Sequence, residues 1–353
     1  MLKTIIKKLL CVFTLFLSNF MFLGFAFNLN NQIEFDGIIE HLAFTTLMAF
    51  PEKALDSKNN NHAIFDQTKI TPFEFKKILE NLHSNNYILV DINDTFFLEN
   101  STPKKKTLFL PKNKKPIILS FDNVSYKSSY QNLGTIDKII IDRNNEFATY
   151  TTKKSIQDRI NQDNEFIPIL ESFISLHPDF SLNSARGIIF CTGENGLLGY
   201  KTNTKNSRAK TEIKRVFEIV SKLKSLGWKF GCNSYRYTDI NSLTNIELAK
   251  DINLWNKEIQ PLVNPTPLFA YPHGIRSSNK EHDQILAENN FNVLFYNSME
   301  PKFEIFNNSI LATRKAVNGN TLRNNSKDFE HLFNCKDVYD HTNRTIPFDT
   351  LSL

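Results

Sequence analysis

Short apolar runs alternate with amphipathic segments from about residue 70 to residue 300, and this alternation constrains the fold more than any other feature. Apolar runs bounded by polar residues predict strands, whereas apolar residues recurring at helical spacing predict helices. We expect strands at 87–92, 117–119, 187–191, 228–232, 268–271 and 292–296, and helices at 71–82, 155–177, 211–225, 248–259 and 281–289. This order predicts an α/β fold with a parallel, barrel-like sheet wrapped by helices.

Two of the expected helices carry distinctive signals. Thr71, Pro72 and Glu74 form a helix start, with threonine as the N-cap, proline at the first helical position and glutamate three residues past the cap. The segment 211–225 is the most clearly amphipathic helix of the chain, because its apolar residues form one stripe opposite lysines. The stripe consists of Ile213, Val216, Phe217, Val220 and Leu223.

Two segments interrupt the alternation. Residues 138–142 are an apolar run followed by the polar residues 143–146, a pattern typical of a β-hairpin that leaves the main sheet. Residues 101–115 contain six lysines. We interpret this second segment as a solvated connecting loop, because a run of like charges is usually a soluble surface rather than a binding patch.

The amino terminus is a candidate targeting segment. Lys3, Lys7 and Lys8 precede the stretch 9–30, which contains no charged residue. A basic start followed by an apolar stretch is typical of a secretory signal or an uncleaved membrane anchor, so we assign residues 1–30 to one of these two. The remaining residues, 31–353, are long enough for one α/β barrel, and we expect a single domain there.

Charge and cysteine content narrow the function classes. Without the three lysines of the leader, the net charge of +5 falls to +2, which is too small to indicate a nucleic-acid partner. Cys191, Cys232 and Cys335 lie beyond the leader, and an odd number excludes a complete disulfide framework. Cys191 and Cys232 each end an apolar run and could be neighbours on adjacent strands, either as two buried thiols, which we favour, or as a disulfide.

The stretch 116–126 carries the clearest chemical signal. Its apolar run ends in Ser120, Phe121, Asp122 and Asn123, so that polar side chains follow directly on a short buried strand. Catalytic groups of parallel α/β folds gather at the carboxyl ends of the strands. Asp122 is therefore a candidate general base or metal ligand. The alternative is that Asp122 only caps the following turn.

Three segments resemble the motifs of polysaccharide deacetylases with a NodB-type catalytic domain, the group called carbohydrate esterase family 4. Residues 120–123 resemble the family's T-F-D-D motif, residues 227–239 its G-W-E-I-(G/A)-S-H-S-x-x-H-x-D stretch, and residues 269–274 its F-x-(Y/P)-P-(Y/F)-G stretch. The segments occur in the family's order, and the resemblance covers residues 37 to about 345. It implies a distorted (β/α) barrel and hydrolysis of N-acetyl groups on sugars.

The resemblance also implies a metal site, which this sequence does not keep. Family members hold a divalent metal such as zinc through one aspartate and two histidines, and the ion activates water. Asp122 stands at the position of the catalytic base, but the ligand positions fall on Asn123, Asn233 and Tyr237. All three are poor zinc ligands. We therefore expect no metal cofactor and a catalytic activity that is weakened or lost.

Further residues are candidates for the same site. His273 lies in the third motif and could form a shifted ion site or an acid/base pair with Asp122 and Glu194, although a lone histidine is more often a hydrogen-bonded wall residue. Arg314 falls where the family places an arginine near its site, or forms a surface ion pair. Tyr235 and Tyr271 could stack on sugar rings as substrate-binding residues, or pack in the core.

Two hypotheses about function remain. The first is an exported deacetylase that acts on a cell-wall or extracellular polysaccharide. The second is an inactive relative that uses the pocket to bind a glycan or serves as a scaffold. Both predict a polysaccharide or peptidoglycan-type partner, no nucleic acid, and a location outside the cytoplasm or on the outer face of a bacterial cytoplasmic membrane, held there by the leader. The substituted ligand positions favour the second hypothesis.

Overall fold

A computed structural model describes residues 32–152, 155, 158–203, 207–306 and 308–348. The predicted signal or anchor at residues 1–30 lies outside these residues. Among the helices of the described ranges, none is both long and apolar enough to cross a membrane.

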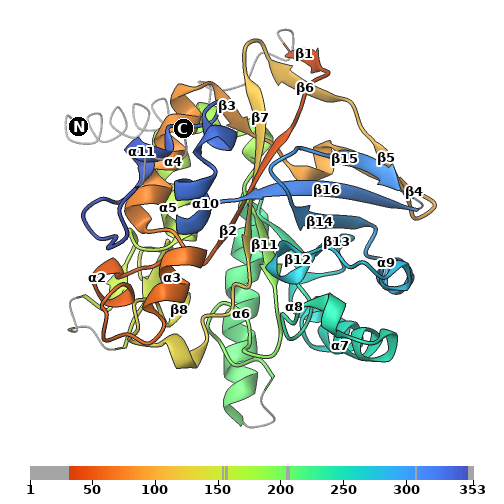
Figure 1. Cartoon of the computed structure of the whole chain (residues 1–353). Helices are drawn as coiled ribbons and strands as arrows, with labels where there is room; N and C mark the ends of the chain where they lie inside the picture. The colour runs from red at the N-terminus through yellow and green to blue at the C-terminus, as the bar shows by residue number, and fades with distance from the viewer. Residues whose placement is uncertain (1–31, 153–154, 156–157, 204–206, 307, 349–353) are drawn as a thin grey trace, which may run out of the picture.

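Seven parallel strands close into a barrel (Figure 1). Each strand pairs with the next one in chain order, and the last strand pairs with the first to close the ring. The strands are β2 (Glu40–Thr45), β7 (Lys115–Asp122), β11 (Ile188–Cys191), β12 (Lys229–Cys232), β13 (Leu268–Ala270), β14 (Val293–Asn297) and β16 (Ser309–Ala316). The predicted α/β class is confirmed, and the barrel is consistent with the NodB-type (β/α) barrel that the resemblance implies.

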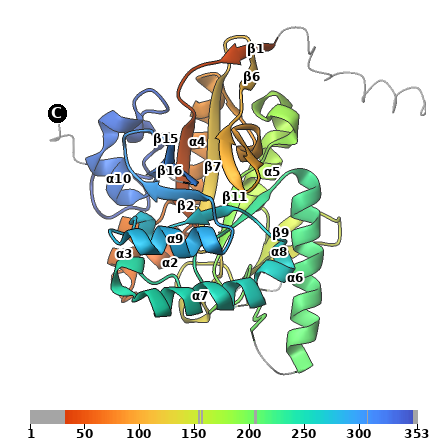
Figure 2. The ribbon, with the colours of Figure 1, turned by 90° about the vertical axis from the view of Figure 1, so that its right-hand side faces the viewer.

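Helices surround the barrel, and α6 runs along one side as the longest of the described helices (Figure 2). They are α2 (Pro51–Ala54), α3 (His62–Thr68), α4 (Pro72–Ser84), α5 (Phe166–Leu176), α6 (Ser207–Leu226), α7 (Asn245–Glu258), α8 (Gln260–Val263), α9 (Lys280–Glu288), α10 (Gly319–Asn324) and α11 (Cys335–Val338). The remaining strands are β1 (Gln32–Phe35), β3 (Tyr87–Leu89), β4 (Phe96–Glu99), β5 (Thr102–Lys105), β6 (Leu108–Pro111), β8 (Lys138–Ile141), β9 (Phe147–Tyr150), β10 (Ile160–Asn161) and β15 (Phe303–Phe306).

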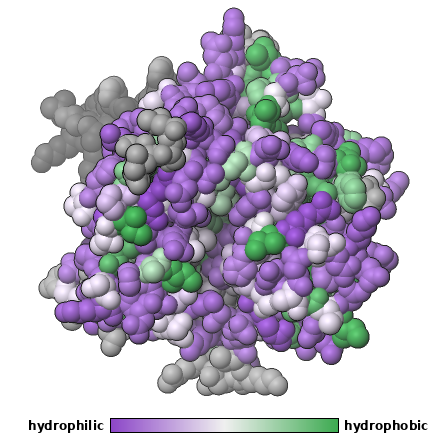
Figure 3. All heavy atoms as spheres, in the orientation of Figure 1, coloured by the Kyte–Doolittle hydropathy of each residue, from purple (hydrophilic) through white to green (hydrophobic). Residues whose placement is uncertain are grey.

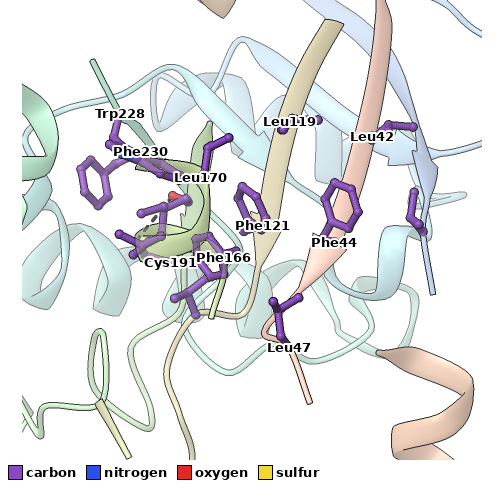
Figure 4. Close-up of a cluster of buried hydrophobic side chains, with 14 of the residues drawn as sticks. Leu42, Phe44, Leu47, Leu119, Phe121, Phe166, Leu170, Cys191, Trp228 and Phe230 are labelled. Atoms are coloured by element: carbon purple, nitrogen blue, oxygen red, sulfur yellow. Dashed lines mark hydrogen bonds between the residues drawn. The ribbon is translucent and has the colours of Figure 1, made fainter. Parts of the chain in front are cut away.

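The main core lies between the outer face of the barrel and these helices. Figure 4 shows Phe44 and Phe121 pointing from β2 and β7 toward Phe166 of α5. The rings of Phe121 and Phe166 stack with centroids 3.8 Å apart, and Trp228 packs 6.0 Å from both. Such aromatic contacts bury large apolar areas, so they fix how α5 sits against the strand that carries Asp122.

Local sequence signals are largely confirmed. Thr71 accepts a hydrogen bond from the backbone N–H of Glu74, whose carboxylate accepts one from the N–H of Thr71, so α4 begins with the predicted capping box. The predicted hairpin is the antiparallel pair β8 and β9. Cys191 lies beside Cys232 in the register of β11 and β12, and both are free, buried thiols as favoured from sequence.

Three predictions about secondary structure were wrong. The lysine-rich segment 101–115 contains β5 and β6, because its apolar residues Leu108 and Leu110 are buried while the lysines extend outward. The helix expected from residue 155 begins only at Phe166, where Glu165 caps it. The stripe of α6 is narrower than predicted: Val216, Val220 and Leu223 are buried, whereas Ile213 and Phe217 are exposed.

The face shown in Figure 3 is predominantly hydrophilic, with hydrophobic residues scattered over it. Exposed hydrophobic residues that stand singly are normal on soluble domains. This face therefore indicates no binding surface, and the cavities and the buried polar groups are the candidates for function.

Candidate functional site

The centre of the site is an ion pair inside the carboxyl end of the barrel. Asp122 is the last residue of β7, and Arg314 lies on β16, two strands away across β2. The guanidinium donates from Nη1 and Nη2 to the two carboxylate oxygens, at 2.7 and 2.8 Å. Asp122 is 5% exposed and Arg314 is 1% exposed. Arg314 is therefore a buried partner of the candidate base, and the alternative of a surface ion pair was wrong.

A chain of polar groups continues from this pair into the barrel. Arg314 Nη1 also donates to Ser120 Oγ at 3.2 Å, and Ser120 Oγ lies 2.9 Å from His41 Nε2. Burial, and then the charge of Arg314, lower the pKa of His41 well below its ordinary value, so His41 is neutral. His41 also lines a second cavity, of about 380 Å³, at the other end of this series of hydrogen-bonded groups.

The carboxamides at two predicted ligand positions are engaged by their neighbours. Asn233 accepts a hydrogen bond from the backbone N–H of Asn123 at 2.9 Å and donates to the carbonyl of Ala270 at 2.8 Å. Asn123 Oδ1 accepts from Thr192 and Ser125, at 3.2 and 3.3 Å. Asn123 has a φ of 54°, a left-handed conformation that asparagine tolerates. Both side chains thus hold the loops that follow β7, β11 and β12.

Tyr237 and His273 lie together at the wall of the site. Their ring centroids are 4.5 Å apart, and His273 Nε2 lies 3.1 Å from the backbone carbonyl of Tyr237. Burial, with a smaller contribution from the charge of Asp122, raises the pKa of the Tyr237 phenol, so this group stays protonated at neutral pH. The predicted ligand position therefore holds a neutral phenol.

These residues border one cavity of about 330 Å³. Asp122, Asn123, Tyr237 and His273 line it together with aromatic rings and neutral polar side chains. Among the aromatic residues are Phe44, Phe65, Tyr126 and Tyr130, and among the polar ones are Thr45, Thr46, Ser125, Thr135, Asn297 and Asn318. The structure thus brings together residues that the sequence places in three separate motifs.

Other predicted site residues lie elsewhere. Tyr271 is fully buried against Phe269, and its hydroxyl is hydrogen-bonded to Asp283, so its ring offers no face to a sugar. Tyr235 is 7% exposed, donates to Glu258 at 2.6 Å and does not line the cavity. The prediction that both tyrosines contact substrate was therefore wrong, because their side chains are buried and hydrogen-bonded in the protein interior.

The proposed grouping of Glu194 with Asp122 and His273 does not form. Glu194 is exposed and lies 4.0 Å from Arg236. Within the described ranges, no group of three or more histidine, cysteine, aspartate or glutamate side chains could hold a metal ion.

Sequence reasoning missed a buried polar cluster behind the cavity. Lys69 lines the cavity, and burial lowers the pKa of its ammonium group to about 8. Glu165 is fully buried; its carboxylate accepts from the backbone N–H groups of Leu47 and Phe166, and burial raises its pKa to about 7. The position of Glu165 before an apolar helix could have marked it as a cap. No local sequence pattern predicts the burial of Lys69, because this burial results from tertiary packing.

This cluster predicts a specific pH dependence of stability. The folded-state pKa of Glu165, about 7, lies above its ordinary value of 4.5, so its protonation stabilises the fold. That contribution is fully present below pH 4.5 and is lost as the pH rises through 7, amounting to about 3 kcal/mol. Urea denaturation from pH 4 to pH 8 should therefore show the wild type losing stability relative to Glu165→Gln. A constant difference between the two proteins across this range would contradict the assignment.

Comparison with known proteins gives a likeness in fold. No protein-family model matches the sequence, and no curated protein matches it. Among solved structures, the chain is similar to a Streptococcus pyogenes deacetylase in complex with acetate, at 14% identity over 82% of this chain and 95% of that one, with a TM-score of 0.46. For a de-N-acetylase from Aggregatibacter actinomycetemcomitans, the identity is 13% over 84% and 98%, with a TM-score of 0.44. For a CE4 family pseudoenzyme from Bacillus anthracis, the identity is 12% over 46% of this chain and 54% of that one, with a TM-score of 0.27.

The donor set of the cavity does not fit the divalent metal that the sequence resemblance implies. Both oxygens of Asp122 accept hydrogen bonds from Arg314. The carboxamide of Asn233 accepts one hydrogen bond through its oxygen and donates one through its nitrogen, and Tyr237 is a protonated phenol. Zinc sites need several deprotonated or imidazole ligands with free lone pairs. His273 is one such group, and a single ligand does not make a site.

Proposed function

We propose that this protein binds a polysaccharide in the Asp122 cavity, as an exported and catalytically inactive relative of the polysaccharide deacetylases. One observation carries the proposal: the side chains at the three predicted metal-ligand positions are neutral, while Asn123 and Tyr237 still line a cavity together with Asp122. Without a metal ion, the deacetylase reaction loses the Lewis acid that polarises the amide and activates water. What remains is a site that can recognise a sugar.

The composition of the cavity supports sugar binding. Its volume of about 330 Å³ suits a small ligand or one unit of a chain. Aromatic rings such as Phe65 and Tyr130 offer flat apolar faces, and Asn297 and Asn318 offer amide donors and acceptors for hydroxyl groups. Export is supported by the leader at residues 1–30, which matches a signal or membrane anchor and would place the protein on the outer side of the membrane.

A weak deacetylase is the second candidate. It is favoured by the presence of Asp122, at the base position, and His273 in the same cavity. Asp122, however, is held with both oxygens on Arg314, and His273 contacts Tyr237 rather than Asp122. A general base needs a lone pair within hydrogen-bond reach of the water that it activates. Saccharide binding therefore agrees better than deacetylase activity with the contacts of Asp122 and His273.

The two functions are separated by measuring binding and chemistry on the same preparation. We expect the purified full-length chain to bind an N-acetylated oligosaccharide in a calorimetric titration, and to release no acetate from it with or without added zinc. Asp122→Asn is the matched control for chemistry, because it keeps the shape of the side chain and removes the base. Zinc-dependent acetate release that disappears in this variant would replace the binding proposal with the deacetylase. Absence of saccharide binding would contradict the proposal as well.

A further inference from the structure

Lys69 is a buried cation with an unused hydrogen-bond donor. Its side chain is at the cavity wall, and the residue is 8% exposed. The ammonium group donates to the carbonyl oxygen and the hydroxyl of Thr46, at 2.9 and 2.6 Å. An ammonium group has three N–H donors, and no acceptor for the third lies among the described residues. One donor is therefore available to a ligand.

The side chains that line the cavity carry a net positive charge. Asp122 is the only acidic residue among the described side chains that line it, and Arg314 neutralises this carboxylate. Lys69 and Lys127 both line the cavity, and neither forms an ion pair with a described carboxylate. The buried carboxylate of Glu165 lies behind Lys69 and feels its charge, but it accepts its hydrogen bonds from backbone N–H groups and from the Tyr126 hydroxyl and forms no ion pair with Lys69.

We propose that Lys69 recognises an anionic group, a carboxylate or a phosphate, on the saccharide that occupies this cavity. This inference rests on the proposed glycan binding and adds the chemical class of the glycan. A buried ammonium group without a carboxylate in direct contact is costly, and an anionic oxygen at its free donor would form a charge-assisted hydrogen bond. Lys127 adds attraction at the same wall.

Three sugars with the same ring test the inference: glucose, glucuronate and glucose 6-phosphate. We expect the full-length chain to bind at least one of the two anionic sugars about tenfold more tightly than glucose. Lys69→Met should remove this preference, and Lys69→Arg should retain part of it, because it keeps the charge. Lys250→Met, which removes an exposed lysine of α7, is the matched control and should behave like the wild type. The tighter of the two anionic sugars identifies the carboxylate or the phosphate as the recognised group.

Each other outcome has a separate meaning. Equal binding of all three sugars by the wild type would overturn the anionic class and leave glycan binding intact. A preference that persists in folded Lys69→Met would also overturn the assignment to Lys69. Binding of no saccharide, including the N-acetylated oligosaccharide above, would contradict the proposed function itself. If Lys69→Met does not fold, Lys69→Gln takes its place, because it removes the charge and keeps a polar side chain, and an unchanged preference in that variant would refute the inference.

Discussion

Replacing Arg314 with methionine is expected to destabilise the protein by about 3–5 kcal/mol, because the substitution leaves the carboxylate of Asp122 buried without a partner. The pair is bidentate and both residues are almost completely buried. Arg314 also packs over the rings of Phe190 and Phe295, with its guanidinium carbon 5.1 and 6.0 Å from their centroids, so the variant loses these contacts too. Urea denaturation of the two proteins measures the difference.

A second substitution separates charge from packing. Asp122→Asn in the Arg314→Met background removes the unpaired charge and should restore most of the lost stability, since a buried ion pair is often replaceable by neutral groups of similar volume. Lys76→Met is the control, because the pair of Lys76 with Asp163 is exposed and should contribute less than about 1 kcal/mol. If Arg314→Met were as stable as the wild type, the ion pair would not be the structural centre of the site.

A comparable loss is expected for Arg344→Met, which breaks the buried junction between the carboxyl-terminal segment and the helices α3 and α4. Arg344 Nε and Nη2 donate to the two oxygens of Glu74, at 2.6 and 2.8 Å, and Nη1 donates to Asp66 at 2.8 Å. These three side chains are 0–3% exposed. Removing the arginine leaves Glu74 without a cationic partner, and we expect a loss of about 3–5 kcal/mol in the same urea experiment.

The junction also touches the Asp122 cavity. Arg344 Nη2 donates to the backbone carbonyl of Lys69 at 2.8 Å, so this arginine fixes the chain that carries the cavity's cation. Lys336→Met, an exposed change in α11, is the control and should leave stability unchanged. Adding Glu74→Gln to Arg344→Met should recover part of the loss. No recovery would show that packing, rather than the unpaired carboxylate, accounts for the effect.

The sequence by itself determined the elements and the place of the site. Periodicity, caps and breakers act over a few residues, so the alternation of strands and helices, the capping box at Thr71 and the hairpin after residue 138 could be predicted. The strand that ends in Asp122 was predicted for the same reason. Where local signals were ambiguous, as in the lysine-rich segment 101–115, tertiary pairing decided, and the prediction of a loop was wrong.

Only the tertiary structure decided which side chains meet. Asp122 and Arg314 are 192 residues apart, and their contact depends on the register of β7, β2 and β16 around the closed barrel. The same closure placed Tyr271 in the core and brought Lys69 to the cavity wall. Burial depends on how the strands and helices pack together. It changes the charge and the accessibility of a side chain, and the residues next to it in the sequence do not reveal this. The sequence therefore located the candidate site, whereas packing determined which of its groups are charged and available.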